Sequence, residues 1–166
     1  MSIKNYDIPM MQTALIWAKQ SHCKKRQVGA ILARDGRTIC NGYNGTDTGK
    51  DNDCEEVRAE EEIQERQNMF NYMEEGESKY RKIYLKTKTI VTHAESNLIE
   101  YALEKNINMQ WCTIYVTTQP CLNCSKKIRD AGISKVVYLD SYKNSLGTDY
   151  LLTCGISVIK LNSCEL

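Results

Sequence analysis

The spacing of hydrophobic and polar residues predicts an alternation of helices and strands. Apolar residues recur at helical spacing between Ile8 and Ala18, so residues 9–21 are predicted to form an amphipathic helix. Residues 27–33 and 38–43 are apolar and β-rich on either side of Asp35-Gly36, a pattern typical of a β-hairpin. The remaining pattern predicts helices at 93–105, 121–131 and 148–154, the last capped by Thr148, and strands at 113–117, 135–139 and 156–161.

The segment between the hairpin and residue 93 is strongly charged. Residues 55–75 contain a few apolar residues among many charges, which predicts a solvated helix packed along one narrow stripe. Residues 78–88 interleave Lys and Arg with Tyr, Ile and Leu, and the pattern leaves open an extension of that helix or an interface element. Because helices and strands alternate, we expect an α/β fold with a sheet covered on both faces, in one domain spanning residues 1–166.

Two stretches of the first half are candidates for ligand contact. The loop that begins Gly42-Tyr43-Asn44-Gly45 is rich in glycine, which permits close backbone approach to a ligand, although such loops are usually only turns. The basic run from His22 to Arg26 is either a solvated surface or a grip for a phosphate group.

Candidate metal ligands are found in two short pieces, His93-Ala94-Glu95 and Pro120-Cys121-Leu122-Asn123-Cys124. Two Cys three residues apart at a helix start project from one face, and the helix N-terminus favours their thiolate forms. With the imidazole of His93 as third ligand, this soft donor set favours Zn²⁺ over Mg²⁺ or Ca²⁺.

The number of ligands indicates a catalytic site. Structural zinc is closed by four side chains, whereas catalytic zinc keeps one position for water, whose pKa falls to about 7. Glu95 is close enough to that water to carry its proton. A structural zinc knuckle or a redox pair is the alternative, but Cys112, the nearest fourth candidate, begins a predicted strand, and a redox pair would not explain His93-Ala94-Glu95. H-x-E followed by P-C-x-x-C is a known signature of zinc-dependent nucleobase deaminases.

Composition narrows the substrate and the compartment. The net charge of the 166-residue chain is +1, which provides no strong field for a nucleic-acid polymer and favours a small molecule. Residues 1–12 carry no signal-peptide pattern, and no apolar run is long enough for a membrane span. Eight Cys without a secretion signal indicate reduced thiols, so we expect a cytoplasmic protein.

The chain resembles the deoxycytidylate (dCMP) deaminases of the cytidine deaminase-like superfamily over residues 8–161. The resemblance rests on a set of motifs: Gln27-Val28-Gly29-Ala30, Gly42-Tyr43-Asn44-Gly45, His93-Ala94-Glu95-Ser96-Asn97, residues 115–124 through the Pro-Cys pair, and residues 131–138. It implies a three-layer α/β/α sandwich with a five-stranded mixed sheet. It also implies zinc-dependent hydrolysis of dCMP to dUMP and ammonia for thymidylate synthesis, with Glu95 as proton carrier.

Further roles are implied by the same resemblance. Asn44 would contact the sugar and base region, and Ala94 would offer its backbone N–H to the pyrimidine carbonyl. Arg26 and Tyr142 match positions near the phosphate or base. Many relatives are homo-hexamers, activated by dCTP with Mg²⁺ and inhibited by dTTP at a site that involves the loop Gly42-Tyr43-Asn44-Gly45.

The chain departs from the family pattern at several positions. Asp47 replaces a usual Pro, and Gln119 stands where Ser or Phe often precedes the Pro-Cys pair. Some viral relatives hold a second, structural zinc, and Cys23 and Cys54 match two of its Cys ligands. His22 and His93 are the chain's only histidines, so a second zinc here would need His22 or another ligand.

Other functions stay open at this point. The same chemistry could act on hydroxymethyl-dCMP, free cytidine, tRNA adenosine or a base in single-stranded DNA, although polymer substrates usually require a more basic surface. A non-catalytic zinc-binding or nucleotide-binding module is the alternative from another class. The presence of Glu95 favours an enzyme, because a sensor does not need a proton carrier.

Overall fold

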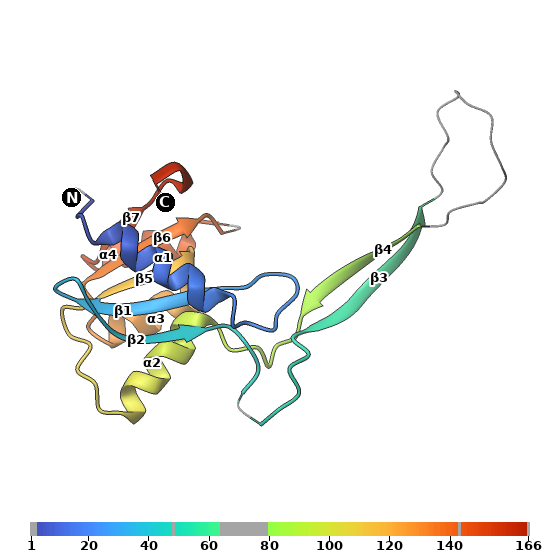
Figure 1. The fold of residues 1–166 in the computed structure, drawn as a ribbon, viewed down its shortest axis with the longest axis horizontal. Coiled ribbons are helices and arrows are strands. Elements are labelled where there is room, and N and C mark those ends of the chain that lie inside the picture. Colours follow the sequence, from blue (N-terminus) through green and yellow to red (C-terminus); the bar gives the residue numbers. More distant parts are fainter. Residues whose placement is uncertain (1–2, 48, 64–79, 143, 166) are drawn as a thin grey trace.

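Helices cover both faces of a five-stranded mixed sheet in the computed structural model, which describes residues 3–47, 49–63, 80–142 and 144–165 (Figure 1). The strand order is β2-β1-β5-β6-β7, in which β1 runs antiparallel to β2 and β5, and β5, β6 and β7 are parallel. The elements are α1 (Asp7–Ala18), β1 (Gly29–Arg34), β2 (Arg37–Tyr43), β3 (Glu55–Ile63), β4 (Tyr80–Thr87), α2 (Ala94–Glu104), β5 (Thr113–Thr118), α3 (Leu122–Asp130), β6 (Lys135–Asp140), α4 (Leu146–Thr153), β7 (Ser157–Lys160) and a 3₁₀ turn (Ser163–Glu165).

Neighbouring residues of each central strand pack into different layers. On one face, α1 covers a cluster that includes Met11, Ile31 and Tyr115. On the other face, α2, α3 and α4 cover a larger cluster that includes Leu32 and Ile114. This alternation follows from the two-residue period of a strand, and it confirms the predicted three-layer α/β/α fold with a five-stranded mixed sheet.

A buried charge cluster ties α1 to the sheet. The carboxylate of Asp7, which is 0% exposed, accepts hydrogen bonds from the Tyr115 hydroxyl (2.7 Å) and from Lys135 Nζ (2.9 Å). Burial alone raises the pKa of Asp7, but the backbone N–H of Lys4 together with Tyr115 and Lys135 outweighs it and lowers the pKa below its ordinary value. Asp7 is therefore buried as a paired carboxylate.

The predicted helix over residues 55–75 is wrong where the structure describes it. Residues 55–63 form β3, which pairs antiparallel with β4, while residues 64–75 lie outside the described residues. Of the two interpretations of residues 78–88, the helix extension is also wrong where the structure describes it, because residues 80–87 form a strand, while the interface element stays a prediction. The glutamates of β3 favour a helix, but the Tyr- and Ile-rich β4 favours a strand, and pairing with it prevails over local propensity. An ion pair between Glu56 and Lys86 (3.2 Å) joins the two strands.

We call β3 and β4 together the arm, which extends away from the five-stranded sheet (Figure 1). Its base is fixed to the basic loop after α1. The backbone N–H groups of Lys24 and Lys25 each donate to the buried carboxylate of Glu55 at 3.1 Å. At the same base, the Lys88 N–H donates a hydrogen bond to the Cys54 carbonyl oxygen (2.9 Å), which closes the arm where it joins the rest of the chain. None of the helices among the described residues is both long and apolar enough to cross a bilayer.

Candidate metal centre and pocket

The metal-binding motifs lie at the starts of two helices. His93 and Cys121 are extended residues (φ −73°, ψ 152° and φ −73°, ψ 166°) that directly precede α2 and α3. Cys124 follows in the first turn of α3, on the same side as Cys121. Because α3 follows β5, the site lies beyond the carboxyl end of this parallel strand, where ligand sites of α/β sheets form.

Three potential ligand atoms converge in this place. His93 Nδ1 lies 3.6 Å from Cys121 Sγ and 3.4 Å from Cys124 Sγ, and all three ligand atoms lie within 4.8 Å of one another. A tetrahedral zinc ion with its usual Zn–S and Zn–N bond lengths holds sulfur and nitrogen roughly 3.5–3.6 Å apart. The donor set therefore fits Zn²⁺ in chemistry and in size, with Nδ1 as the imidazole ligand.

The electrostatics of the protein groups alone favour a thiolate at one of the two cysteines. The hydrogen bond between the two sulfurs lowers the pKa of Cys121 to about 3, and the same hydrogen bond together with burial raises the pKa of Cys124. The hydrogen bond to Cys121 also raises the pKa of His93. Cys121 therefore carries the first thiolate of the cluster.

No fourth protein ligand joins the cluster among the described residues. The predicted nearest candidate, Cys112, directly precedes β5, whereas Cys121 follows its far end, so the two lie at opposite ends of that strand. The buried hydroxyl of Ser96 lies 3.8 Å from Cys124 Sγ, where it supports the sulfur as a hydrogen-bond partner.

Glu95 is directed into the same site from the first turn of α2. Its side chain is only 4% exposed, and this burial raises the pKa of the carboxyl group above its ordinary value. A carboxyl group of raised pKa accepts a proton more readily than an ordinary carboxylate, which suits the role of proton carrier that the sequence pattern predicts for Glu95.

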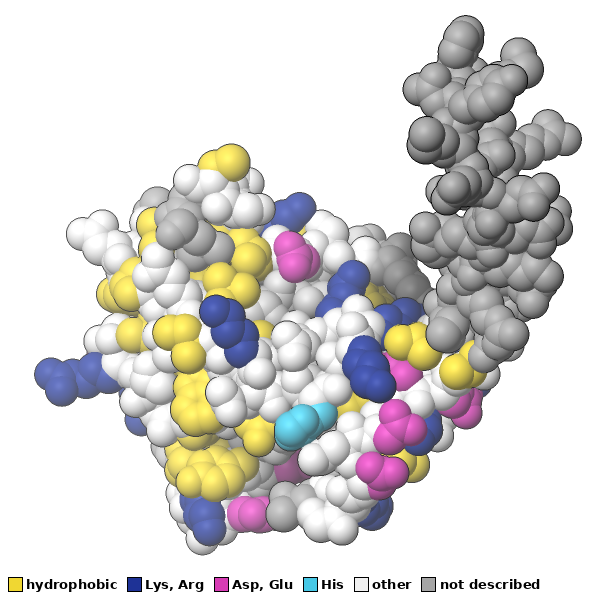
Figure 2. Space-filling model, turned by 45° about the vertical axis from the view of Figure 1, so that its right-hand side comes forward, with side chains coloured by type: hydrophobic (Ala, Val, Ile, Leu, Met, Phe, Trp, Pro, Cys, Tyr) yellow, Lys and Arg dark blue, Asp and Glu magenta, His cyan; other side chains and the backbone are white. Residues whose placement is uncertain are grey.

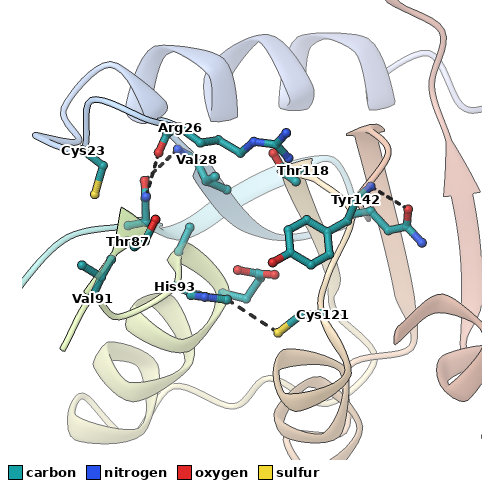
Figure 3. Close-up of a pocket in the computed structure, with 13 residues that line it drawn as sticks. Cys23, Arg26, Val28, Thr87, Val91, His93, Thr118, Cys121 and Tyr142 are labelled. Carbon is teal, nitrogen blue, oxygen red and sulfur yellow. Dashed lines mark hydrogen bonds between the residues drawn. The ribbon is translucent and has the colours of Figure 1, made fainter. Parts of the chain in front are cut away.

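A pocket opens over the cluster (Figure 3). Arg26 reaches over it from one side and the ring of Tyr142 extends into it from the other, above Cys121. The structure thus brings together all four residues expected at the substrate site, Arg26, Asn44, Ala94 and Tyr142. The pocket is lined by Cys23, Arg26, Val28, Asn44, Thr87, Val91, His93, Ala94, Glu95, Thr118, Gln119, Cys121 and Tyr142.

The loop of Gly42 to Gly45 is built into the frame of the site. Asn44 accepts a hydrogen bond from the Val28 N–H (2.7 Å) and donates one to the Arg26 carbonyl oxygen (2.9 Å), so its amide fixes the backbone on that side of the pocket. Gly45 and Thr92 exchange two backbone hydrogen bonds (3.1 and 2.8 Å) in an isolated β-bridge. The loop is therefore attached directly to the residue before His93.

The candidate second zinc ligands also lie together. Cys23 and Cys54 are buried in one small cluster with Val91. Burial, and to a smaller extent the hydrogen bond to Cys54, raises the pKa of Cys23 to about 12. Among the residues that the structure describes, no third His, Cys, Asp or Glu completes a metal cluster with them, and His22 is exposed. A second zinc stays a prediction.

Some pocket residues had no assigned role in the sequence. Thr87 and Val91 lie in a segment without a recognised motif, and Gln119 stands out in the sequence only as a departure from the usual residue before Pro120. Its polarity directly before the Pro-Cys pair was the available signal. The face of the molecule in Figure 2 mixes Lys and Arg with Asp and Glu and shows no continuous basic stripe.

Comparison with known proteins agrees with this geometry. A family model described as the cytidine and deoxycytidylate deaminase zinc-binding region matches residues 4–140. The deoxycytidylate deaminase of Enterobacteria phage T2 is 31% identical over 92% of this chain and 90% of its own length. The deoxycytidylate deaminase of Saccharomyces cerevisiae is 34% identical over 97% of this chain, which spans 46% of the yeast protein. The crystal structure of the dCMP deaminase from cyanophage S-TIM5 in complex with dCMP and dUMP covers 96% of this chain and 100% of its own, with 28% identity and a TM-score of 0.74.

Proposed function

Because the chain belongs to the cytidine and deoxycytidylate deaminase family, we propose that it hydrolyses dCMP to dUMP and ammonia. The observation that carries this proposal is the cluster of three metal donors beside the buried Glu95, at the base of a pocket. Support for dCMP as the substrate comes from the relatives of this chain, which include two phage deoxycytidylate deaminases and a dCMP deaminase solved in complex with dCMP and dUMP.

His93, Cys121 and Cys124 would hold Zn²⁺ through one imidazole nitrogen and two sulfurs. When bound, the ion supplies the Lewis acidity that makes water a nucleophile at neutral pH. Three protein donors, rather than the four of a structural site, suit this catalytic role.

Glu95 moves the protons of the reaction. Its carboxylate accepts a proton from the attacking water and delivers it to N3 of the cytosine ring, so that C4 becomes the electrophile. After attack at C4, Glu95 takes the proton of the new C4 hydroxyl and delivers it to the amino nitrogen, which leaves as ammonia while the C4 carbonyl of dUMP forms. Burial raises the pKa of Glu95, and this allows the side chain to hold the proton between the two transfers.

The pocket walls hold the nucleotide against this site. As the first residue of α2, Ala94 has a backbone N–H that the helix does not use, and it donates to the pyrimidine carbonyl. The guanidinium of Arg26 pairs with the 5′-phosphate, and the Tyr142 ring covers the base. Asn44 keeps Arg26 and Val28 in place and lies beside the sugar.

Regulation belongs to the same proposal. dCTP with Mg²⁺ and dTTP would act at the loop of Gly42 to Gly45 in a homo-hexamer. The Gly45–Thr92 bridge supports this, because a displacement of the loop reaches the residue before His93 through two backbone hydrogen bonds. A cytoplasmic location belongs to the same proposal, and it is supported by eight cysteines of which none forms a disulfide.

Ammonia release from a panel of substrates tests the reaction. The panel contains dCMP, CMP, deoxycytidine and hydroxymethyl-dCMP, each with and without dCTP or dTTP plus Mg²⁺, together with a count of bound zinc. We expect one zinc per chain and the highest kcat/KM with dCMP. A higher kcat/KM with hydroxymethyl-dCMP, CMP or deoxycytidine would assign a different substrate to the same chemistry, whereas no release from any of these cytosine compounds by the zinc-loaded protein would refute the enzymatic proposal.

A further inference from the structure

We propose that Gln119 is a positioning residue that fixes Tyr142 in the wall of the pocket, a role that rests on the proposed deamination of dCMP. Gln119 follows β5 and precedes Pro120. Its side chain is 7% exposed and belongs to the pocket lining. A polar side chain this deeply buried needs hydrogen-bond partners, and the identity of those partners indicates its task.

The side-chain amide of Gln119 connects two residues of the loop between β6 and α4, Tyr142 and Asn144, with Thr148 inside α4. Its Nε2 donates to Thr148 Oγ1 (2.9 Å) and to the Asn144 carbonyl oxygen (3.3 Å), which uses both amide hydrogens. Its Oε1 accepts the backbone N–H of Tyr142 at 3.0 Å. One side chain thus joins the start of α4 to the residue that covers the pocket.

These partners determine the orientation of the amide. Thr148 donates its own hydroxyl hydrogen to the Ser145 carbonyl oxygen (2.9 Å), so it acts as an acceptor toward Gln119. Asn144 likewise presents an acceptor, while Tyr142 presents a donor. A flipped amide would oppose donor to donor and acceptor to acceptor, and neither Glu nor an apolar residue provides two donors and one acceptor at this length.

The ring of Tyr142 depends on this attachment. Tyr142 is 37% exposed and extends into the pocket above Cys121 (Figure 3). The backbone N–H that Gln119 holds belongs to the residue whose ring forms this wall. Because β5 continues into Gln119, the amide transmits the rigid position of the sheet to a residue on a surface connection. Without it, we expect the ring to sample other positions and the pocket to bind the nucleotide less tightly.

This role predicts an effect on KM rather than on kcat. Gln119→Met keeps the length of the side chain and removes all three hydrogen bonds, so KM for dCMP should rise about tenfold while kcat stays within about twofold and zinc content is unchanged. The dissociation constant of dUMP, measured by calorimetry, should rise in parallel. Gln110→Met is the matched control, because Gln110 is exposed and precedes β5 rather than following it.

A double-mutant cycle separates positioning from general packing. If Gln119 acts through the ring, adding Gln119→Met to Tyr142→Ala should change KM by less than about twofold. Equal KM increases in both backgrounds, or a loss of kcat or zinc in Gln119→Met, would overturn the assignment. If Gln119→Met does not fold, Thr148→Val removes one of the three bonds and should raise KM about two- to threefold, again only when Tyr142 is present.

A readout without substrate distinguishes the two proposals. Amide exchange at Tyr142 should accelerate about tenfold in Gln119→Met, because its N–H loses its acceptor. Unchanged exchange would refute the positioning role even if dCMP is the substrate. If amide exchange at Tyr142 accelerates in Gln119→Met but the parent chain does not deaminate dCMP, the hydrogen bond between Gln119 and Tyr142 is supported and the proposed reaction is refuted.

Discussion

Gly147 sits where α4 approaches the start of α3, and adding a single methyl group there should loosen the metal centre. A Cβ at this position would lie 2.1 Å from the Pro120 carbonyl oxygen, 2.8 Å from Ser125 Oγ and 2.9 Å from the Cys121 carbonyl carbon. Two of these atoms are backbone atoms beside the metal ligand Cys121. To reach even 3.0 Å from the Pro120 oxygen, the two helices must separate by about 1 Å (3.0 − 2.1 = 0.9).

The magnitude follows from two opposing effects. Overpacking of this kind costs about 3 kcal/mol at the upper end of its range, because the colliding groups are backbone and cannot rotate away. Alanine is favoured over glycine inside a helix by about 1 kcal/mol. Gly147→Ala should therefore lower the free energy of unfolding by about 2 kcal/mol, which for a chain of this length corresponds to a Tm decrease of roughly 4–8 °C.

Differential scanning calorimetry and zinc retention check this expectation. Gly45→Ala is the control for stability, since a Cβ on Gly45 meets no atom within 4 Å, and its Tm should stay near that of the parent chain. In Gly147→Ala, a chelator should also remove zinc faster, because Cys121 belongs to the displaced backbone. A Tm equal to or above that of the parent would show that α4 does not rest on the start of α3 as described.

Three further outcomes follow from the site and the core. Glu95→Gln should keep its zinc and lose about 10²–10⁴-fold in kcat for ammonia release from dCMP; a variant of near-normal kcat would exclude Glu95 as the proton carrier. Cys121→Ser should lose zinc by metal analysis and melt earlier, whereas Cys154→Ser, at an exposed free thiol, should do neither. The lowered pKa of Asp7 means that its stabilisation is fully present above its ordinary pKa of 3.8 and is lost as pH falls through the folded-state value. Asp7→Asn leaves the 13%-exposed Lys135 unpaired and should lower the free energy of unfolding, measured in urea at pH 7, by about 3 kcal/mol. The free energy of unfolding of this variant should also depend less steeply on pH in the acid range, and an unchanged pH dependence would refute the pairing.

The metal centre could be predicted from the sequence because its ligands occupy short, local motifs. His93, Cys121 and Cys124 stand at helix starts, and helix starts can be recognised from a few adjacent residues. The parallel arrangement of β5, β6 and β7 could likewise be expected from strands that alternate with helices. The structure then brought distant motifs together at one end of the sheet.

The errors arose where long-range pairing decides local structure. The glutamate-rich segment after residue 55 favours a helix by composition, and only its pairing with β4, separated from it by residues outside the described set, makes it a strand. The start of α4 was placed at Thr148 because a threonine can cap a helix, but α4 begins at Leu146. Thr148 lies inside the helix and uses its hydroxyl for Ser145 and Gln119.

The functional importance of Gln119 could not be predicted for a related reason. Its partners, Tyr142, Asn144 and Thr148, are 23 to 29 positions away along the chain. Nothing in the local sequence indicates that a glutamine will meet two acceptors and one donor at the correct places. A hydrogen-bond network among residues of different elements becomes visible only when the fold has placed them.

The closure at the base of the arm has a consequence for how this protein can change. The chain leaves the sheet domain after Cys54 and returns at Lys88, and one backbone hydrogen bond (2.9 Å) joins these two residues. Because exit and re-entry lie at a single point, the part of the arm beyond Glu55 and Thr87 could be shortened, lengthened or replaced by a simple turn. The zinc ligands, the pocket and both hydrophobic layers would then keep their places. Natural variation in length is therefore best tolerated here, and a fluorescent or affinity module could be grafted at the same place.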